Sequence, residues 1–226
     1  MEEKKAEPGK KVILFQGDSI TDGGRLRGKE NEWDLNHQMG HGYAFLINCI
    51  LGTKYPGEHL EFYNRGLSGN RIADLYGRWK EDCLCMKPDV LSIMVGANDC
   101  GFTLQDHTGS EPERFEKIYQ LLLEEAREAN PQIRLVLCEP FTLPSGVRKT
   151  DYEDWKRVLA PLQEKTRRVA ERNGAVFVPL QERFLELLQV REAEYWIWDG
   201  IHPTVCGHQV IAEQWLKYAG ELWREV

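Results

Sequence analysis

Residues 11–22, KVILFQGDSITD, carry the pattern that decides the fold. Lys11–Gln16 is a short apolar run rich in β-branched residues, and Gly17-Asp18-Ser19 stops it at once. A run of this length that ends at a breaker is typical of a buried parallel strand passing into a turn. The stretch therefore predicts a strand with polar residues at its carboxyl end.

Four more runs of the same kind follow, at Leu60–Asn64, Val90–Val95, Ile133–Cys138 and Ala175–Val178. Helical patterns separate or follow these runs. They lie at about Gly42–Leu51, Ile72–Met86, Glu111–Asn130, Tyr152–Asn173, Leu180–Val190 and Thr204–Trp223. Strands that alternate with helices predict right-handed βαβ crossovers, and hence an α/β fold with a doubly wound parallel sheet of five strands.

Three connections are longer than packing requires: Asp22–His41, Asp99–Ser110 and Glu139–Asp151. All three follow a strand, on the side where open α/β sheets bind ligands, so we expect irregular loops around a functional site. The chain shows no internal repeat and no linker composition. We therefore expect one domain over residues 1–226, with residues 1–10 as a flexible tail.

The composition excludes several classes of protein. The chain has 226 residues, a net charge of −7 and 42% apolar residues, which indicates a globular protein and argues against a nucleic-acid partner. No window is apolar enough to span a membrane, and MEEKKAEPGK has no signal-peptide core. The six cysteines include only a C-x-C pair, Cys83 and Cys85, which predicts free thiols and no zinc. We expect a cytoplasmic location.

Four polar clusters follow the predicted strands or lie near the C-terminus. Ser19 stands on a strand-to-helix turn, which can expose its hydroxyl and its own backbone N–H together. Gly69, within NRGLSGN (residues 64–70), lets a backbone N–H approach a ligand. Asn98 offers a neutral amide donor, and His202, three residues after Asp199, could serve as a base. Taken singly, each cluster also fits an ordinary turn or helix cap.

In their order and spacing, these clusters resemble the SGNH hydrolases, also called GDSL-type esterases. The match covers about residues 11–216, through Gly17-Asp18-Ser19, Gly69, Gly96-x-Asn98-Asp99 and Asp199-x-x-His202. More narrowly, FQGDSITD, NRGLSGNR and WDGIHP are similar to segments of bacterial carbohydrate (xylan) acetylesterases. The resemblance implies a three-layer α/β/α sandwich of the flavodoxin-like type.

The resemblance also implies the chemistry of a serine esterase without metal or organic cofactor. Ser19 would be the nucleophile, His202 the base and Asp199 the residue that orients it. The N–H groups of Ser19 and Gly69 and the Asn98 side chain would form the oxyanion hole. The substrate would be a small-molecule or oligosaccharide ester, and the chain could form a homo-oligomer. Candidate substrate contacts are Asp18, His41, Trp196 and Trp198, whereas His59 and His208 look incidental.

Other functions fit less well. A haloacid-dehalogenase-type phosphatase needs a second Asp two residues after Asp18, where this chain has Ile20. Residues 23–29, GGRLRGK, match a phosphate-binding loop, but Glu30 replaces the Ser or Thr that would hold magnesium. We interpret them as part of a mobile active-site loop. A thioesterase or lysophospholipase of the same superfamily remains an alternative, as does a non-catalytic carbohydrate-binding protein.

Overall fold

The computed structural model describes residues 9–28 and 36–226. Most of the expected N-terminal tail therefore lies outside the described residues, as do residues 29–35 of the expected loop Asp22–His41, with Lys29 and Glu30. Five parallel strands form a sheet in the order β2-β1-β3-β4-β5, which confirms the predicted sheet. They are β1 (Lys11–Gly17), β2 (Leu60–Asn64), β3 (Val90–Met94), β4 (Arg134–Cys138) and β5 (Val176–Val178).

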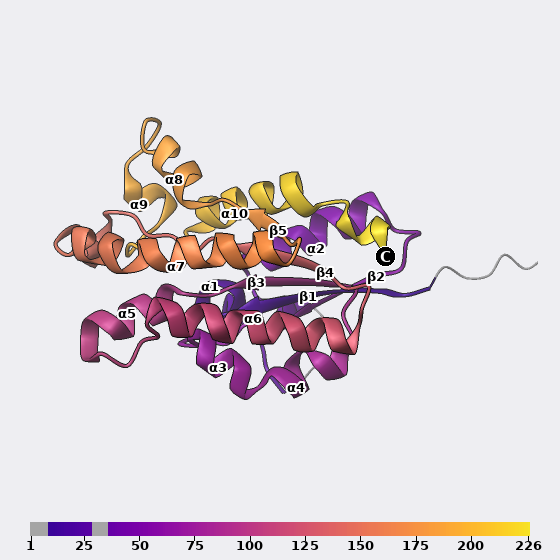
Figure 1. Ribbon diagram of the computed structural model, residues 1–226. Helices are drawn as coiled ribbons and strands as arrows, with labels where there is room; N and C mark the ends of the chain where they lie inside the picture. Colours follow the sequence, from indigo (N-terminus) through magenta and orange to yellow (C-terminus); the bar gives the residue numbers. More distant parts are fainter. Residues whose placement is uncertain (1–8, 29–35) are drawn as a thin grey trace, which may run out of the picture.

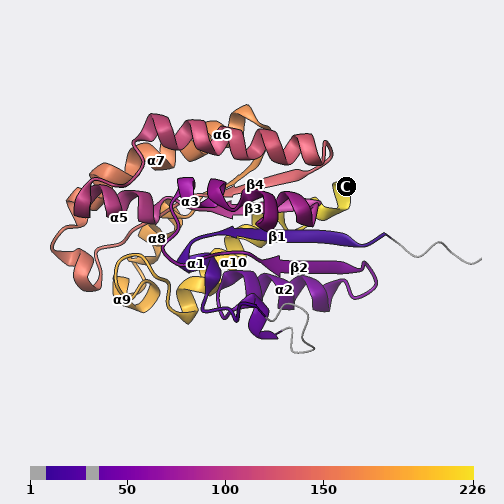
Figure 2. The same cartoon turned by 90° about the horizontal axis from the view of Figure 1, so that it is seen from below.

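Helices cover both faces of the sheet, because successive side chains of a strand point to opposite sides. Ile13 and Phe15 of β1 belong to one buried cluster, and Leu14 belongs to the other. Figure 1 shows α2 and α10 on one side of the sheet and α3 and α6 on the other, and Figure 2 looks onto the sheet, with β2, β1, β3 and β4 side by side, so the three-layer α/β/α architecture is confirmed. The helices are α1 (Ser19–Asp22), α2 (Tyr43–Lys54), α3 (Ile72–Gly77), α4 (Trp79–Asp82), α5 (Ala97–Asp106), α6 (Pro112–Ala129), α7 (Tyr152–Arg172), α8 (Gln181–Leu187), α9 (Ala193–Trp196) and α10 (Val205–Ala219), with 3-10 turns η1 (Asn36–Met39), η2 (Leu84–Met86), η3 (Gly146–Lys149) and η4 (Leu222–Glu225).

One buried tryptophan fixes the position of α10, the helix that follows the Asp199–His202 segment. Trp215 is fully buried, and its indole N–H donates to the Ser92 hydroxyl of β3 at 3.0 Å. Its ring also packs on Phe15 of β1, with 5.7 Å between the ring centres. A large side chain with its one donor satisfied stabilises a single docking position of the helix on the sheet.

Two expected segments differ from the structure. The expected loop Asp99–Ser110 is largely helix α5. Gly101 lies inside this helix and packs against the Trp155 ring, because a Cβ at Gly101 would lie 3.1 Å from the indole. Glycine disfavours a helix, so the pattern suggested a loop, but the packed indole compensates. The expected helix Ile72–Met86 is instead divided into α3, α4 and η2, with a break after Gly77.

The carboxyl ends of the strands meet at one end of the molecule. Figure 1 shows α5 and α9 at this end, opposite the C-terminus. The segment Glu139–Asp151 also lies there and has little regular structure apart from η3, as expected for a functional loop. Among the described residues, every helix is too short or too polar to cross a lipid bilayer.

Candidate active site

The turn after β1 presents Ser19. A Cβ at Gly17 would collide with the Met94 carbonyl oxygen and the Thr21 hydroxyl, so only glycine lets the strand turn here. The Asp18 carboxylate then accepts a hydrogen bond from the Ile20 N–H at 3.0 Å and caps α1. Ser19 is the first residue of α1 and stays partly exposed above the sheet.

Ser19, His202 and Asp199 form one hydrogen-bonded chain. The Ser19 Oγ lies 2.8 Å from His202 Nε2, and His202 Nδ1 lies 2.7 Å from Asp199 Oδ2. An ionised carboxylate can only accept, so Nδ1 carries the ring proton and Nε2 is left to accept the serine proton. The three predicted residues are therefore arranged for proton transfer from serine to histidine.

The hydrogen bond between His202 and Asp199 shifts the pKa values of the two groups in opposite directions. The hydrogen bond to Asp199 raises the pKa of His202 above 6.5, against the opposing effect of burial. Burial alone would raise the pKa of Asp199, but hydrogen bonds from the His202 ring and from two backbone N–H groups outweigh it. The pKa of Asp199 is therefore lowered, and its carboxylate stays charged beside the imidazole.

The segment Glu139–Asp151 supports the turn that carries Asp199 and His202. The Gly200 carbonyl oxygen accepts hydrogen bonds from the Thr142 hydroxyl at 2.9 Å and from the Leu143 N–H at 3.0 Å. Gly200 has φ +98°, and a Cβ there would collide with the Arg148 side chain. The turn therefore depends on glycine and on the segment Glu139–Asp151. The motif spacing of Asp199 and His202 gave no signal of this support.

Asn98 and Gly69 lie in adjoining segments. The Asn98 amide donates to the Asn70 carbonyl oxygen at 3.1 Å, which brings the end of β3 against the NRGLSGN segment. Gly69 has φ +84°, and no atom lies within 4 Å of where its Cβ would be. Its backbone is therefore open to a ligand, in a conformation that glycine favours. The role of Asn98 and Gly69 as oxyanion donors stays a prediction.

The candidate substrate contacts separate into two groups. A cavity of about 200 Å³ contains Ser19 and His202, and His41 and Trp198 line it. Trp198 is 57% exposed and stacks on the His202 ring, with 5.8 Å between ring centres. Asp18 and Trp196 do not line this cavity.

The position of Asp18 corrects one of the predicted contacts. Asp18 is 1% exposed and serves as the cap of α1, and burial raises its pKa to about 7. Trp196 packs against the apolar core on the α10 side of the sheet. Asp18 is therefore closed to a substrate, whereas Trp196 is partly buried and lies outside the cavity around Ser19. Asp18 is not a substrate contact, and a contact through Trp196 stays a prediction.

His208, which looked incidental in the sequence, also lines the cavity. It lies on α10 one turn after the Thr204 cap, and the residue is 7% exposed. A histidine four residues beyond a helix cap is an unremarkable pattern. Only the docking of α10 against the sheet turns this side chain toward Ser19.

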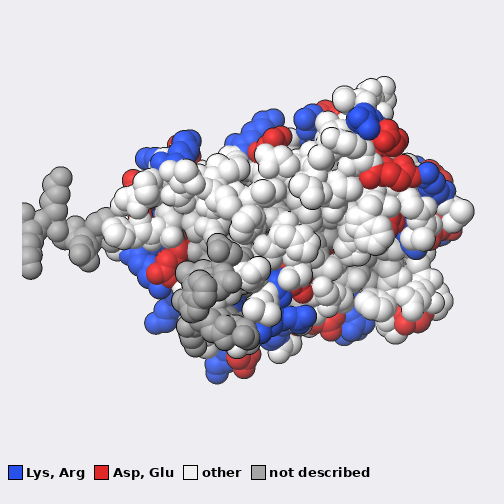
Figure 3. Space-filling model, turned by 180° about the vertical axis from the view of Figure 1, so that it is seen from behind, with Lys and Arg blue, Asp and Glu red and all other residues white. Residues whose placement is uncertain are grey.

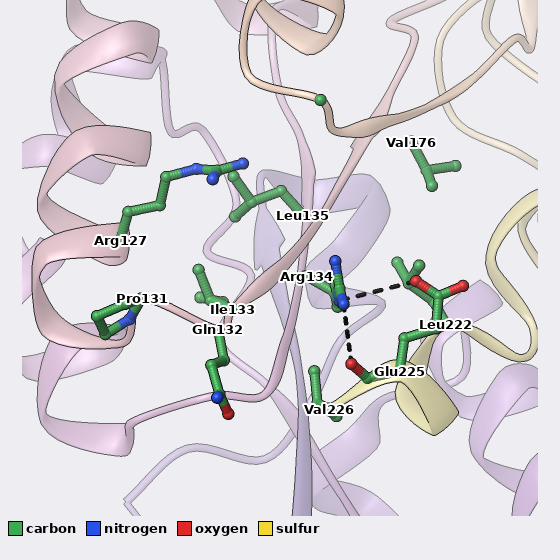
Figure 4. Close-up of a pocket in the computed structure, with 11 residues that line it drawn as sticks. Arg127, Pro131, Gln132, Ile133, Arg134, Leu135, Val176, Leu222, Glu225 and Val226 are labelled. Atoms are coloured by element: carbon green, nitrogen blue, oxygen red, sulfur yellow. Dashed lines mark hydrogen bonds and ion pairs between the residues drawn. The ribbon is translucent and has the colours of Figure 1, made fainter.

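A larger cavity, of about 640 Å³, lies at the amino ends of β4 and β5 (Figure 4). It is lined by Arg127, Arg134 and the C-terminal residues, and Arg134 donates to the Glu225 carbonyl oxygen at 2.9 Å. No serine or histidine lines it. Within residues 9–28 and 36–226, no group of three or more His, Cys, Asp or Glu could hold a metal ion.

The comparisons with known proteins agree with this geometry. The model of the GDSL-like lipase/acylhydrolase family matches residues 15–210. An acetylxylan esterase from Geobacillus stearothermophilus is 32% identical over 213 residues, covering 93% of this chain and 94% of the relative.

Solved structures agree as well. A structure described as a GDSL-like lipase, from Parabacteroides merdae, has a TM-score of 0.88 and 37% identity, covering 95% of this chain and 98% of its own. The Geobacillus acetylxylan esterase structure has a TM-score of 0.82 and 31% identity, covering 96% and 98%. The chain is therefore a carboxylic ester hydrolase and belongs to the GDSL-like lipase/acylhydrolase family.

Proposed function

We propose that this esterase removes acetyl groups from carbohydrate alcohols such as xylo-oligosaccharides. The observation that carries the proposal is the Ser19–His202–Asp199 chain, which opens into a cavity of only about 200 Å³ beside an exposed indole. The exposed indole face of Trp198 beside Ser19 and His202 suits a sugar ring, which favours a carbohydrate as the alcohol half of the ester. The name of the Geobacillus relative, acetylxylan esterase, supports the same substrate class.

The proposed reaction has two halves. Ser19 Oγ attacks the ester carbonyl carbon while His202 Nε2 takes its proton, and the resulting oxyanion receives hydrogen bonds from the N–H groups of Ser19 and Gly69 and from the Asn98 amide. His202 then returns the proton to the departing alcohol oxygen, which leaves an acetyl-serine. Water attacks this acetyl group in the same way, and acetate is released as Ser19 recovers its proton.

Asn98→Ala is expected to lower kcat about a hundred- to a thousand-fold, roughly 3–4 kcal/mol, the usual loss for one oxyanion donor. KM should change little, because the donor acts on charge that develops only in the transition state. Steady-state kinetics on an aryl acetate measures both constants. A strong rise in KM with an unchanged kcat would instead make Asn98 a ground-state binding residue.

The proposed acetyl preference predicts a steep fall in kcat/KM from C2 to C8 acyl esters of one aryl alcohol. In a cramped pocket each added methylene is a steric penalty, whereas in an open apolar groove it contributes about 0.8 kcal/mol of favourable burial. Acetylated xylo-oligosaccharides should then release acetate readily. A rise in kcat/KM toward C8 would contradict the proposal.

One observation favours the alternative, a thioesterase or lysophospholipase. A second cavity, of about 400 Å³, lies beside Asn98 and includes the apolar side chains Phe102, Leu104 and Ile201. Its wall also carries Arg148 and Asp151, which are paired at 2.7 Å. An ion pair is a poor neighbour for a long acyl chain, because ions lose hydration where apolar groups cover them. The acyl series distinguishes the two substrates directly.

The surroundings of the enzyme stay predictions. On the face shown in Figure 3, Lys and Arg are interspersed with Asp and Glu around a broad uncharged area, and no continuous basic stripe is seen. Together with the net charge of −7, this supports the absence of a nucleic-acid partner. We also propose one domain and a cytoplasmic location. We propose as well that the protein forms a homo-oligomer, and gel filtration with light scattering would measure its oligomeric state.

A further inference from the structure

We propose that His208 determines specificity for the alcohol half of the ester. Its ring Nε2–H would donate a hydrogen bond to a hydroxyl or ring oxygen of a polyol bound beside His202. The inference rests on the proposed carbohydrate substrate and assigns one group of the protein to it. A simple alkyl or aryl alcohol, which lacks such an oxygen, would gain nothing from this donor.

The first step concerns where the alcohol lies. His202 Nε2 must give its proton to the departing alcohol oxygen, so the alcohol has to lie within hydrogen-bond reach of that nitrogen. His202 shares the cavity of about 200 Å³ with Ser19 and His208, whereas Gly69 and Asn98 do not line it. Two of the three proposed oxyanion donors therefore lie outside this cavity, which leaves it for the alcohol half of the ester.

The second step concerns which ring nitrogen of His208 faces the ligand. The Tyr43 backbone N–H donates to His208 Nδ1 at 3.2 Å, so Nδ1 carries no hydrogen. In a neutral ring the hydrogen is then on Nε2. Among the described residues, no hydrogen-bond partner is found for His208 Nε2. This nitrogen is also not one of the fully buried polar atoms without a partner, so part of its surface stays accessible. It is a donor left open at the cavity.

The third step concerns charge and orientation. Burial lowers the pKa of His208 to about 4, and the nearby His41 and His202 act in the same direction. The ring is therefore neutral at pH 7 and offers one fixed N–H. The backbone of Gly42 holds it in place, since a Cβ at Gly42 would lie 3.1 Å from His208 Cε1. A preoriented neutral donor binds a hydroxyl without a large loss of entropy.

The chain offers a matched pair of substitutions at this position. In His208→Asn the amide oxygen can take the place of Nδ1 and still accept from Tyr43, but the pocket donor is lost. In His208→Gln the longer amide can place an N–H near the position of Nε2, but the acceptor for Tyr43 is lost. His59→Asn, on an exposed residue just before β2, is the control for a histidine substitution elsewhere.

The measurement compares kcat/KM for acetylated xylo-oligosaccharide with kcat/KM for an aryl acetate. We expect His208→Asn to lower the sugar value about 5- to 10-fold, mainly through KM, as for one neutral hydrogen bond. Its aryl acetate value should fall less than the sugar value, because the aryl alcohol has no oxygen that the Nε2–H could reach. His208→Gln and His59→Asn should keep the wild-type ratio of the two substrates.

Each outcome has one meaning. A wild-type enzyme that cleaves the aryl ester but not the acetylated sugar would refute the proposed function itself. With a wild type active on both, an unchanged ratio in His208→Asn would overturn the role of His208, as would equal losses on both esters. If His208→Asn did not fold, its activity on the aryl ester would be lost as well. In that case His208→Gln is the test: if it were active but had lost the preference for the sugar ester, the role of His208 would be overturned.

Discussion

Replacing Ser19 by Ala is expected to lower kcat/KM for an aryl acetate by a factor on the order of 10⁵ to 10⁶, as for loss of a nucleophile in other serine hydrolases. The Ser19 Oγ is 2.8 Å from His202 Nε2, and no acyl-enzyme can form once it is removed. The fold should persist, because Ser19 is partly exposed and its cap is supplied by Asp18. Thermal unfolding should show a nearly unchanged Tm.

An inhibitor that phosphonylates serine separates Ser19 from the other serines of the site region. Ser68 is the matched control, since it is exposed but its hydroxyl donates to the Asp22 carboxylate at 3.1 Å and not to a histidine. Ser145 is fully buried. We expect label on Ser19 alone and normal activity in Ser68→Ala. Label on Ser68 or Ser145 would show that the nucleophile is misassigned.

The strands could be predicted because each is a short apolar run with a breaker at its end. All five lie within one residue of the expected ranges, since a strand buried on both faces is dictated by its own side chains. Helix α5 could not be found in this way. Gly101 weakens its pattern, and the compensating contact comes from Trp155, more than fifty residues later.

The reacting groups could be predicted better than their surroundings. Ser19, Asp199 and His202 lie in local motifs, and the structure brings them into hydrogen-bond contact. His208 and Arg148 have no local motif. Each reaches the site because a helix or loop from another part of the chain docks there, and that docking is a tertiary property. Trp196 and Trp198 show the same limit, since residues two positions apart lie in different surroundings.

Asp199→Asn is expected to lower kcat on the order of 10⁴-fold while leaving the three side chains nearly in place. Asp199 Oδ1 already accepts from the backbone N–H groups of His202 and Ile201, at 2.7 and 3.0 Å. The amide oxygen of Asn should keep these two bonds, which turns its NH₂ toward His202 Nδ1. That nitrogen must then accept, so the ring hydrogen moves to Nε2, where it blocks transfer from Ser19.

The pH dependence provides a second readout of the same substitution. In the wild type, catalysis needs neutral His202, so kcat/KM should rise as the pH increases through a pKa above 6.5. Without the charge of Asp199 this pKa falls, because Asp199 is the largest cause of its increase, so the residual activity should begin at lower pH. Asp154→Asn, on the exposed side of α7, should change neither the rate nor the profile. If Asp199→Asn lost less than about tenfold and its acidic limb stayed in place, Asp199 would not be the residue that orients His202.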